Sequence, residues 1–227
     1  MKISIITSCT GDKTVSNPDQ LTQKDFEQGE SHVRRREAAL AACMRPAGML
    51  YAGEQHVRLM RGVETAREQG AKISVSILSA GYGVVKEGQM IAPYEMTFNT
   101  MKKKESRAWA TMLGIQEGVR EVLAAPSDMT LILLGDRYLQ ACELDSVTQP
   151  NSPVWALCGK GSIKRFSPAF QLVLLQQSHT RQFGAAMTCL KGSIAARILE
   201  NIRLGPAEAI RQAFVQPQTP AYAGSLF

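Results

Sequence analysis

Four short apolar runs divide the first part of the chain, and each is followed at once by small, polar or basic residues. The runs lie at residues 2–7, 72–78, 130–134 and 154–157. Their length and their content of Ile, Val and Leu are typical of buried strands. The loops that follow them begin at Ser8, Ser79, Gly135 and Gly159. Because ligands of α/β proteins bind outside the carboxyl ends of the strands, we expect these loops to share one edge of a sheet and to form a ligand site.

The intervals between the runs have helical periodicity. Apolar residues in 55–69 recur at Val57, Met60, Val63 and Ala66, which predicts one helical stripe on the sheet. Further helices are expected over residues 32–43, 102–123, 170–177, 192–203 and 206–214. Residues 14–30 are polar and unpatterned, and predict a loop or mobile insertion. Alternating strands and helices predict an α/β fold, with a mostly parallel open sheet and helices on both faces.

After Ser162 the pattern changes from alternating strands and helices to helices alone. We expect an α/β core over residues 1–162 with the ligand site, and a helical extension over 163–227 that ends in a loose tail at 216–227. Within the extension, Ile194, Ile198 and Ile202 form an apolar stripe. The helix that carries them is either a small DNA-reading helix or a helix that packs on the sheet.

Composition narrows the class of protein. The formal net charge of +6 and the pI near 9.2 favour an anionic partner. The five cysteines are scattered without paired spacing, which favours reduced thiols in the cytoplasm over a disulfide framework. No apolar run is long enough to span a bilayer, and the first residues do not have the pattern of a secretory signal. We therefore expect a cytoplasmic protein without membrane contact; the oligomeric state is not indicated.

The loop after the first run has the residues of an anion cradle. Ser8, Cys9, Thr10 and Lys13 would offer backbone N–H groups, hydroxyls and one positive charge. The alternative is an ordinary strand-to-loop turn with a capping hydroxyl. Cys9 also lies where a thiolate would be stabilised, although no histidine adjoins it.

Two tyrosines and two carboxylates follow the second and third runs. Tyr82 and Tyr94 would stand at the rim of the site and stack on a base, or they are half-buried core tyrosines. Glu95 and Asp136 are the catalytic candidates, since two carboxylates with separated pKa values can divide the acid/base and nucleophile roles at a glycosidic bond. Asp136 alternatively caps the helix that begins near Arg137.

The loop after the fourth run contains residues 159–162, Gly-Lys-Gly-Ser, which lack the spacing of a P-loop. A nucleoside triphosphatase is therefore disfavoured, but one phosphate contact from Lys160 is compatible with this loop. The predicted ligand-binding residues are Ser8, Cys9, Thr10, Lys13, Ser79, Gly81, Tyr82, Tyr94, Gly135, Arg137, Lys160 and Ser162.

Clusters of basic residues predict a nucleic-acid surface if they share a face, and otherwise they are solvated helix faces. These residues are Arg34, Arg35, Arg36, Lys102, Lys103, Lys104, Lys164 and Arg165. The histidines His32, His56 and His179 are too irregularly spaced to predict a metal site, and no cofactor is implied.

Several of these motifs together carry a resemblance. Residues 78–85 (LSAGYGVV) followed by 91–96 (IAPYEM) resemble the "LSGLYG…PY" signature of the YaaA-like superfamily, which includes a peroxide-stress protein and poorly described bacterial and phage relatives. Residues 8–13 (SCTGDK), 50–53 (LYAG) and 134–138 (LGDRY) resemble further motifs of that superfamily. The core domain of archaeosine synthase is similar more distantly. The resemblance covers about residues 1–160 and implies an α/β fold with nucleic-acid or nucleobase association.

Two classes of function follow. The first is an enzyme that acts on a nucleotide or on a base in nucleic acid, DNA more than RNA, by N-glycosidic cleavage or base exchange. The second is a non-enzymatic DNA-binding protein linked to DNA damage, stress or phage biology. Carboxylates at the strand ends favour the enzyme, because a pure binder gains nothing from negative charge beside its phosphate contacts.

Overall fold

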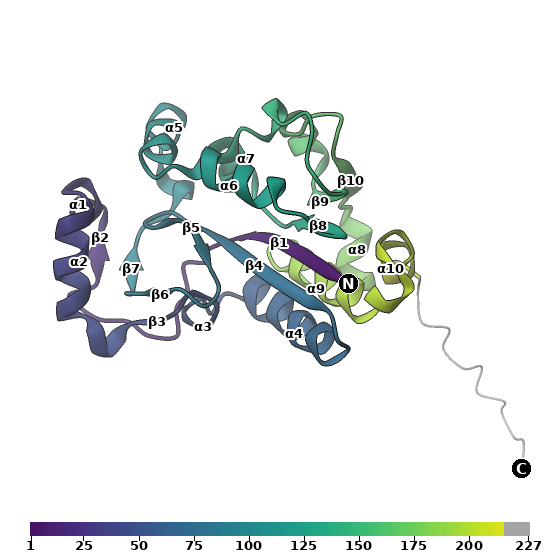
Figure 1. The fold of residues 1–227 in the computed structure, drawn as a ribbon, viewed down its shortest axis with the longest axis horizontal. Helices are drawn as coiled ribbons and strands as arrows, with labels where there is room; N and C mark the ends of the chain where they lie inside the picture. The colour runs from purple at the N-terminus through teal and green to yellow at the C-terminus, as the bar shows by residue number, and fades with distance from the viewer. Residues whose placement is uncertain (216–227) are drawn as a thin grey trace, which may run out of the picture.

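A six-stranded sheet forms the centre of the protein in the computed structural model, which describes residues 1–215 (Figure 1). Its strands are β1 (Lys2–Ser8), β4 (Lys72–Ser79), β5 (Gly83–Lys86), β8 (Met129–Ile132), β9 (Val154–Cys158) and β10 (Gln171–Leu174). Their order is β10-β9-β8-β1-β4-β5, and every neighbouring pair is parallel except β4 and β5. The four predicted strands and the mostly parallel sheet are thus confirmed.

The register of the strands brings their carboxyl ends to one edge. Ser8 pairs with Leu78, and the N–H of Leu133 donates to the carbonyl of Ile6. On the other side of β8, Ile132 pairs with Ala156. Since β1, β4, β8 and β9 run in the same direction, the loops at Ser8, Ser79, Gly135 and Gly159 all leave from this edge, as the sequence predicts.

Helices cover both faces of the sheet (Figure 1). One face has α4 (Glu54–Glu68) and α9 (Leu190–Glu200), and the other has α5 (Lys103–Met112), α6 (Ile115–Ala124) and α7 (Asp136–Cys142). Helices α4 and α9 approach closely at two glycines, which have no side chain to keep the helices apart. A side chain at Gly62 would collide with Ala196, and one at Gly192 would collide with the carbonyl of Gln55. The stripe formed by Ile194, Ile198 and Ile202 is buried, which supports the packing alternative for α9.

Residues 14–30 are not an unstructured insertion, so that prediction is wrong. They contain β2 (Leu21–Thr22) and α1 (Gln23–Glu27) and lead into α2 (Glu30–Ala39). Strand β2 pairs in parallel with β7 (Tyr94–Glu95), and two apolar side chains of the segment, Leu21 and Phe26, are buried. Two apolar anchors are too few to produce a periodic signal, yet they are enough to hold the segment against the strand ends.

Two helix predictions need correction. Residues 102–123 form two helices, because Gly114 has φ of 61° and interrupts the helix between α5 and α6. Residues 170–177 contain the strand β10 rather than a helix. This strand lies at the edge of the sheet with half-buried Leu172 and Val173, so its short apolar run could not be told from a helical turn by periodicity.

Short elements complete the described residues. They are η1 (Ala41–Cys43), β3 (Arg45–Pro46), α3 (Ala47–Leu50), β6 (Met90–Ile91), η2 (Phe98–Thr100), η3 (Leu144–Ser146), η4 (Lys160–Arg165), α8 (Gln177–Gln182), η5 (Ile202–Leu204) and α10 (Pro206–Ala213). Within residues 1–215 no helix has the length and apolar character needed to cross a membrane. The predicted loose tail at 216–227 lies outside the described residues.

Candidate functional site

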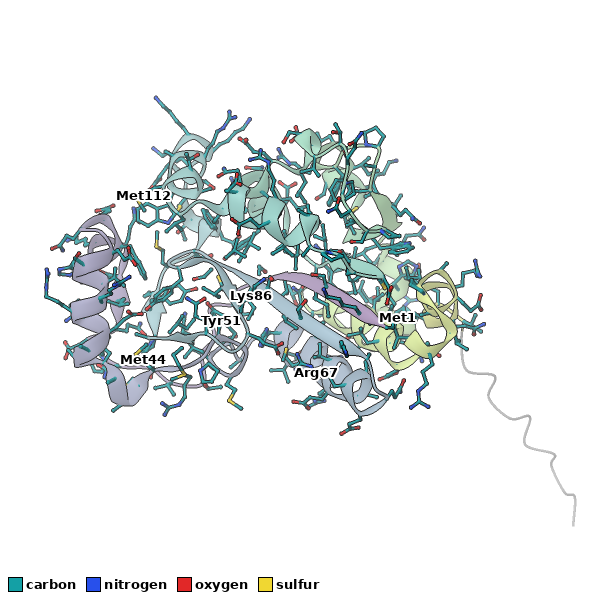
Figure 2. All side chains as sticks on the ribbon, in the orientation of Figure 1. Met1, Met44, Tyr51, Arg67, Lys86 and Met112 are labelled. Atoms are coloured by element: carbon teal, nitrogen blue, oxygen red, sulfur yellow. The ribbon has the colours of Figure 1, made fainter. Side chains whose placement is uncertain are left out.

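A chain of buried hydroxyl groups lies at the ends of β4 and β7. The Ser79 hydroxyl donates to the Tyr94 hydroxyl at 2.8 Å, and the hydroxyls of Tyr94 and Tyr51 are 3.0 Å apart. Figure 2 labels Tyr51 in the region between the central sheet and α2. All three side chains are almost fully buried. Buried hydroxyls that bond one another keep their polar atoms satisfied, and they fix the geometry of the strand ends.

Cys9 lies beside this chain, directly after β1. Its Sγ is 3.0 Å from the hydroxyl of Tyr138, which α7 brings in from the other side. The N–H of Cys9 donates to the carbonyl of Leu78, which holds the thiol beside β4. Cys9 and Tyr138 are also buried. We call the five side chains together the hydroxyl–thiol cluster: Tyr51, Ser79, Tyr94, Cys9 and Tyr138.

The tyrosines of the cluster stay protonated at neutral pH. Burial raises the pKa of Tyr51, Tyr94 and Tyr138 above the ordinary tyrosine value, and the neighbouring Cys9 raises it further. The cluster therefore presents neutral hydroxyl groups, which can donate or accept hydrogen bonds without carrying charge.

Lys13 and Glu95 bring charge to this cluster. The Lys13 ammonium lies 4.5 Å from the centre of the Tyr94 ring and donates to the carbonyl of Gly11. Burial lowers the pKa of Lys13, while Cys9, Glu95 and Asp12 act against that shift. Glu95 itself is exposed. A half-buried lysine beside neutral hydroxyls and a carboxylate is the kind of environment in which proton transfer is arranged.

The loop after β1 also has a structural role. The Thr10 hydroxyl donates to the carbonyl of Asp12 and accepts from the N–H of Gly53, the residue that precedes α4. Thr10 therefore supplies the hydroxyl bonds that are expected if this loop is an ordinary strand-to-loop turn. Ser8 is half-buried at the end of β1.

The loop after β4 closes on its own serine. The N–H groups of Gly81 and Tyr82 both donate to the Ser79 hydroxyl, at 3.2 and 3.0 Å. These N–H groups are engaged within the protein, and Gly81 is covered by the ring of Phe26, with which a side chain at that position would collide. Ser79 and Gly81 thus organise the strand end instead of facing solvent.

The two predicted rim tyrosines differ. Tyr94 is fully buried, so its placement at the rim is wrong: β7 pairs with β2, Phe26 packs edge-on against the ring, and Lys13 lies over its face. Tyr82 is half-buried and lines a cavity of ≈ 460 Å³. Figure 2 labels Met112, another residue of this cavity, at the end of α5 toward α2.

A second group of charges lies at the ends of β8 and β9. Asp136 accepts hydrogen bonds from Ser162 and Arg165, each at 3.2 Å, and from Gln140 at 3.0 Å. Although partial burial acts in the opposite direction, these bonds and the charge of Arg165 hold the pKa of Asp136 below its usual value. Asp136 is in the first turn of α7 and Gly135 precedes the helix, so Asp136 is not its capping residue.

Lys191 completes this second group, which we call the Asp136 group (Asp136, Ser162, Arg165 and Lys191). Its ammonium donates to the carbonyl of Leu134 at the strand edge. Burial lowers the pKa of Lys191 to about 8, although Cys158 and Asp136 favour its charged form. The sheet edge therefore holds two groups of polar contacts, with Glu95 in the first near Lys13 and Asp136 in the second.

The remaining predicted residues are at the surface. Gly135, Arg137 and Lys160 are exposed beside the Asp136 group. Of the basic runs, Lys102, Lys103, Lys104 and Lys164 are exposed, as are Arg34 and Arg35. Arg34 pairs with Glu30, Arg36 pairs with Asp25 and also bonds the carbonyl of Asp19, and Arg165 is engaged by Asp136.

Three polar site residues were not among the sequence candidates: Tyr51, Tyr138 and Lys191. Tyr51 and Tyr138 lie in the motifs at 50–53 and 134–138 that carry the resemblance, so a signal for them was present. Lys191 lies in a helix far along the chain, and no local pattern connects it with Leu134.

The family comparison covers most of this edge. A family model matches residues 39–158, a span that includes Tyr51, Ser79, Tyr94 and Tyr138. No curated protein matches the chain. Because the matched span is more than half of the sequence, the chain belongs to DUF6884, a family of unknown function.

Proposed function

We propose that the protein is an enzyme that acts on a nucleotide or on a base in nucleic acid, with N-glycosidic cleavage or base exchange as its reaction. The observation that carries this proposal is the hydroxyl–thiol cluster with Lys13 and Glu95 at the carboxyl edge of the sheet. A packed core does not need five polar side chains and a half-buried lysine at one strand edge, whereas active sites commonly gather groups with shifted pKa values. The resemblance of the strand-end motifs to the YaaA-like superfamily supports a nucleobase ligand.

The reaction needs a proton donor and a group that stabilises positive charge on the sugar. The bond from the sugar carbon to the base nitrogen breaks, its electron pair leaves with the base, and a proton is delivered to the base. Water or an incoming base then bonds to the sugar carbon and gives up a proton, which restores the group that protonated the leaving base. Asp136, whose pKa is lowered mainly by Arg165 against the effect of burial, suits the charge-stabilising role.

Glu95 suits the acid/base role because it lies near Lys13, the lysine whose pKa is lowered by burial. The half-buried Tyr82 and its cavity are then the place for the base, since an aromatic ring offers a stacking surface. The two carboxylates would act together only when the substrate spans both polar groups of the edge.

The test compares Glu95→Gln and Asp136→Asn with the parent protein. Each change keeps the size of the side chain and removes its charge, so folding and ligand binding should persist. We expect base release from nucleosides, nucleotides or DNA to fall by about 10²–10⁴-fold, measured by chromatography of the free base. Glu121→Gln, at an exposed position on α6, is the control. Full activity in both variants, or no base release by the parent, would reject the glycosidic reaction.

A non-enzymatic DNA-binding protein is the second candidate, and one observation favours it. Lys102, Lys103 and Lys104 are all exposed at the start of α5, where they can follow a phosphate backbone. Changing all three to glutamate should weaken salt-sensitive DNA binding without unfolding the protein. DNA binding by the parent without any base release would make this candidate the better account.

A further inference from the structure

A groove with three arginines follows α4 and, in its second part, also borders α9; it includes none of the basic runs of the sequence. Two adjoining cavities of ≈ 350 and ≈ 330 Å³ share the side chains of Arg58 and Arg61. The second is also lined by Ser193 and Arg197 from α9. We call this feature the α4–α9 groove and define it by Arg58, Arg61, Ser193 and Arg197.

One end of the groove adjoins the candidate site. The first cavity is lined by Ala52 and Glu54, where α4 begins. The N–H of Ala52 donates to the carbonyl of Asp12 at 2.9 Å, in the same loop as Lys13. A chain-like ligand in the groove would therefore reach the edge where Lys13 and the hydroxyl–thiol cluster lie.

The guanidinium groups of the groove are positioned and only partly neutralised. Arg58 donates to the Ser193 hydroxyl at 3.0 Å and pairs with the exposed Glu54. Arg61 is exposed and forms no ion pair with residues 1–215. The acidic residues at the groove are Glu54 and Glu200, fewer than its arginines.

Arg197 has capacity for a ligand that the described residues do not use. Its guanidinium packs 5.3 Å from the centre of the Phe183 ring, which orients the group. One terminal nitrogen, Nη1, is buried and has no hydrogen-bond partner within residues 1–215. An unmade bond from a buried charged donor is costly, and because the Arg197 side chain lines the second cavity, a turn of its guanidinium toward an anion there would give this donor a partner.

We infer that the α4–α9 groove binds phosphate groups, either along a nucleic-acid strand or on a nucleotide. Three guanidinium groups and a hydroxyl suit phosphate oxygens, because guanidinium offers paired donors. This inference rests on the proposed function for the identity of the ligand, although it is tested by binding alone. It places phosphate contacts on the opposite face of the sheet from Lys102, Lys103 and Lys104.

The test is fluorescence anisotropy with two probes, a short labelled single-stranded oligothymidylate and a labelled nucleoside monophosphate. The variant is Arg61→Gln with Arg197→Gln, and the matched control is Arg120→Gln on α6, at the other face. We expect about a ten-fold or greater loss of affinity and a shallower salt dependence in the double variant. The control should bind as the parent does.

The two probes distinguish the source of the phosphate. Loss confined to the oligonucleotide indicates a strand, and loss with both probes indicates a nucleotide phosphate. A second double variant, Arg61→Lys with Arg197→Lys, keeps both charges and should retain most of the affinity. Circular dichroism and urea unfolding verify that each variant is folded.

Unchanged affinity in the glutamine variant, or no binding of either probe by the parent at low salt, would overturn the inference that the α4–α9 groove binds phosphate. The proposed function fails by a different result, the absence of base release. If the protein binds the oligonucleotide through Arg61 and Arg197 but releases no base, the inference about phosphate binding stands and the glycosidic reaction is rejected.

Discussion

The two halves of the sheet edge are built on different principles. At the ends of β1 and β4 the hydroxyl–thiol cluster is buried, its tyrosines are neutral, and Ser79, Tyr94 and Tyr51 bond one another. At the ends of β8 and β9 the polar atoms are charged, and Asp136 is nearly half-exposed beside Arg165. The first half is part of the packed interior, whereas the second can exchange its partners with water.

This difference separates positioning from charge. Neutral hydroxyls in a buried chain are costly to remove, because each deletion leaves another buried group without a partner. An exposed ion pair adds little to stability, since water can replace either partner. We therefore expect stability to depend on the first half, and the charge that a substrate meets to come mainly from the second half and from Lys13.

The largest expected effect is at Tyr94. Tyr94→Ala should lower the free energy of unfolding by about 3–5 kcal/mol, because a fully buried ring is deleted. Tyr94→Phe should cost about 1–3 kcal/mol, because the hydroxyls of Ser79 and Tyr51 lose their partner. Urea unfolding followed by circular dichroism measures both. A loss in Asp136→Ala as large as that in Tyr94→Ala would remove the contrast between the two halves.

Lys191 sharpens the comparison, since it is a partly buried charge in the second half. Its pKa is about 8 in the folded protein against 10.5 for an ordinary lysine, so the unfolded chain binds more protons between these values. The stability of the parent should rise with pH through this window. Lys191→Met removes the titrating group, so the variant should be more stable than the parent at pH 7. This difference in the free energy of unfolding should shrink by about 3 kcal/mol by pH 10.5.

The measurement is urea unfolding at several pH values between 7 and 10.5, with Lys160→Met as the matched control at an exposed position. The control should run parallel to the parent. If Lys191→Met also runs parallel to the parent, then Lys191 does not titrate differently in the folded state.

The smallest expected effect is the stability change in Asp136→Asn, about 0–1 kcal/mol at neutral pH. Because the folded pKa of Asp136 lies below 3.8, its contribution is present above that pH and disappears as the pH falls through the folded pKa. The stabilities of parent and variant should therefore converge in acid. Divergence below pH 3.8 would show that Asp136 is not stabilised as a carboxylate.

The sequence predicts the scaffold of the site better than its contacts. Apolar runs located β1, β4, β8 and β9, and parallel pairing then required Ser8, Ser79, Gly135 and Gly159 to share an edge. Burial could not be predicted, because Tyr94 is covered by Phe26 from a segment that has no periodic pattern.

Contacts between residues far apart in the sequence could not be predicted for a related reason. Cys9 and Tyr138 are 129 positions apart, and Arg58 and Ser193 are 135 apart. Such pairs depend on how α7 and α9 are placed on the sheet, and local spacing carries no information about that placement. The three arginines of the groove are dispersed in sequence and form no basic run, so only the packing of α4 against α9 reveals them.

The close packing of α9 on α4 also determines how late in synthesis the core can fold. Helix α4 leaves the ribosome early, but Gly192, which contacts Gln55, follows it by well over a hundred residues. Until then one side of α4 has no partner, and its apolar atoms are available to chaperones or to aggregation. A high share of such distant contacts slows folding. Truncation before residue 190 should therefore leave a nascent chain that cannot complete its core, even though all but one strand of the central sheet precede residue 160.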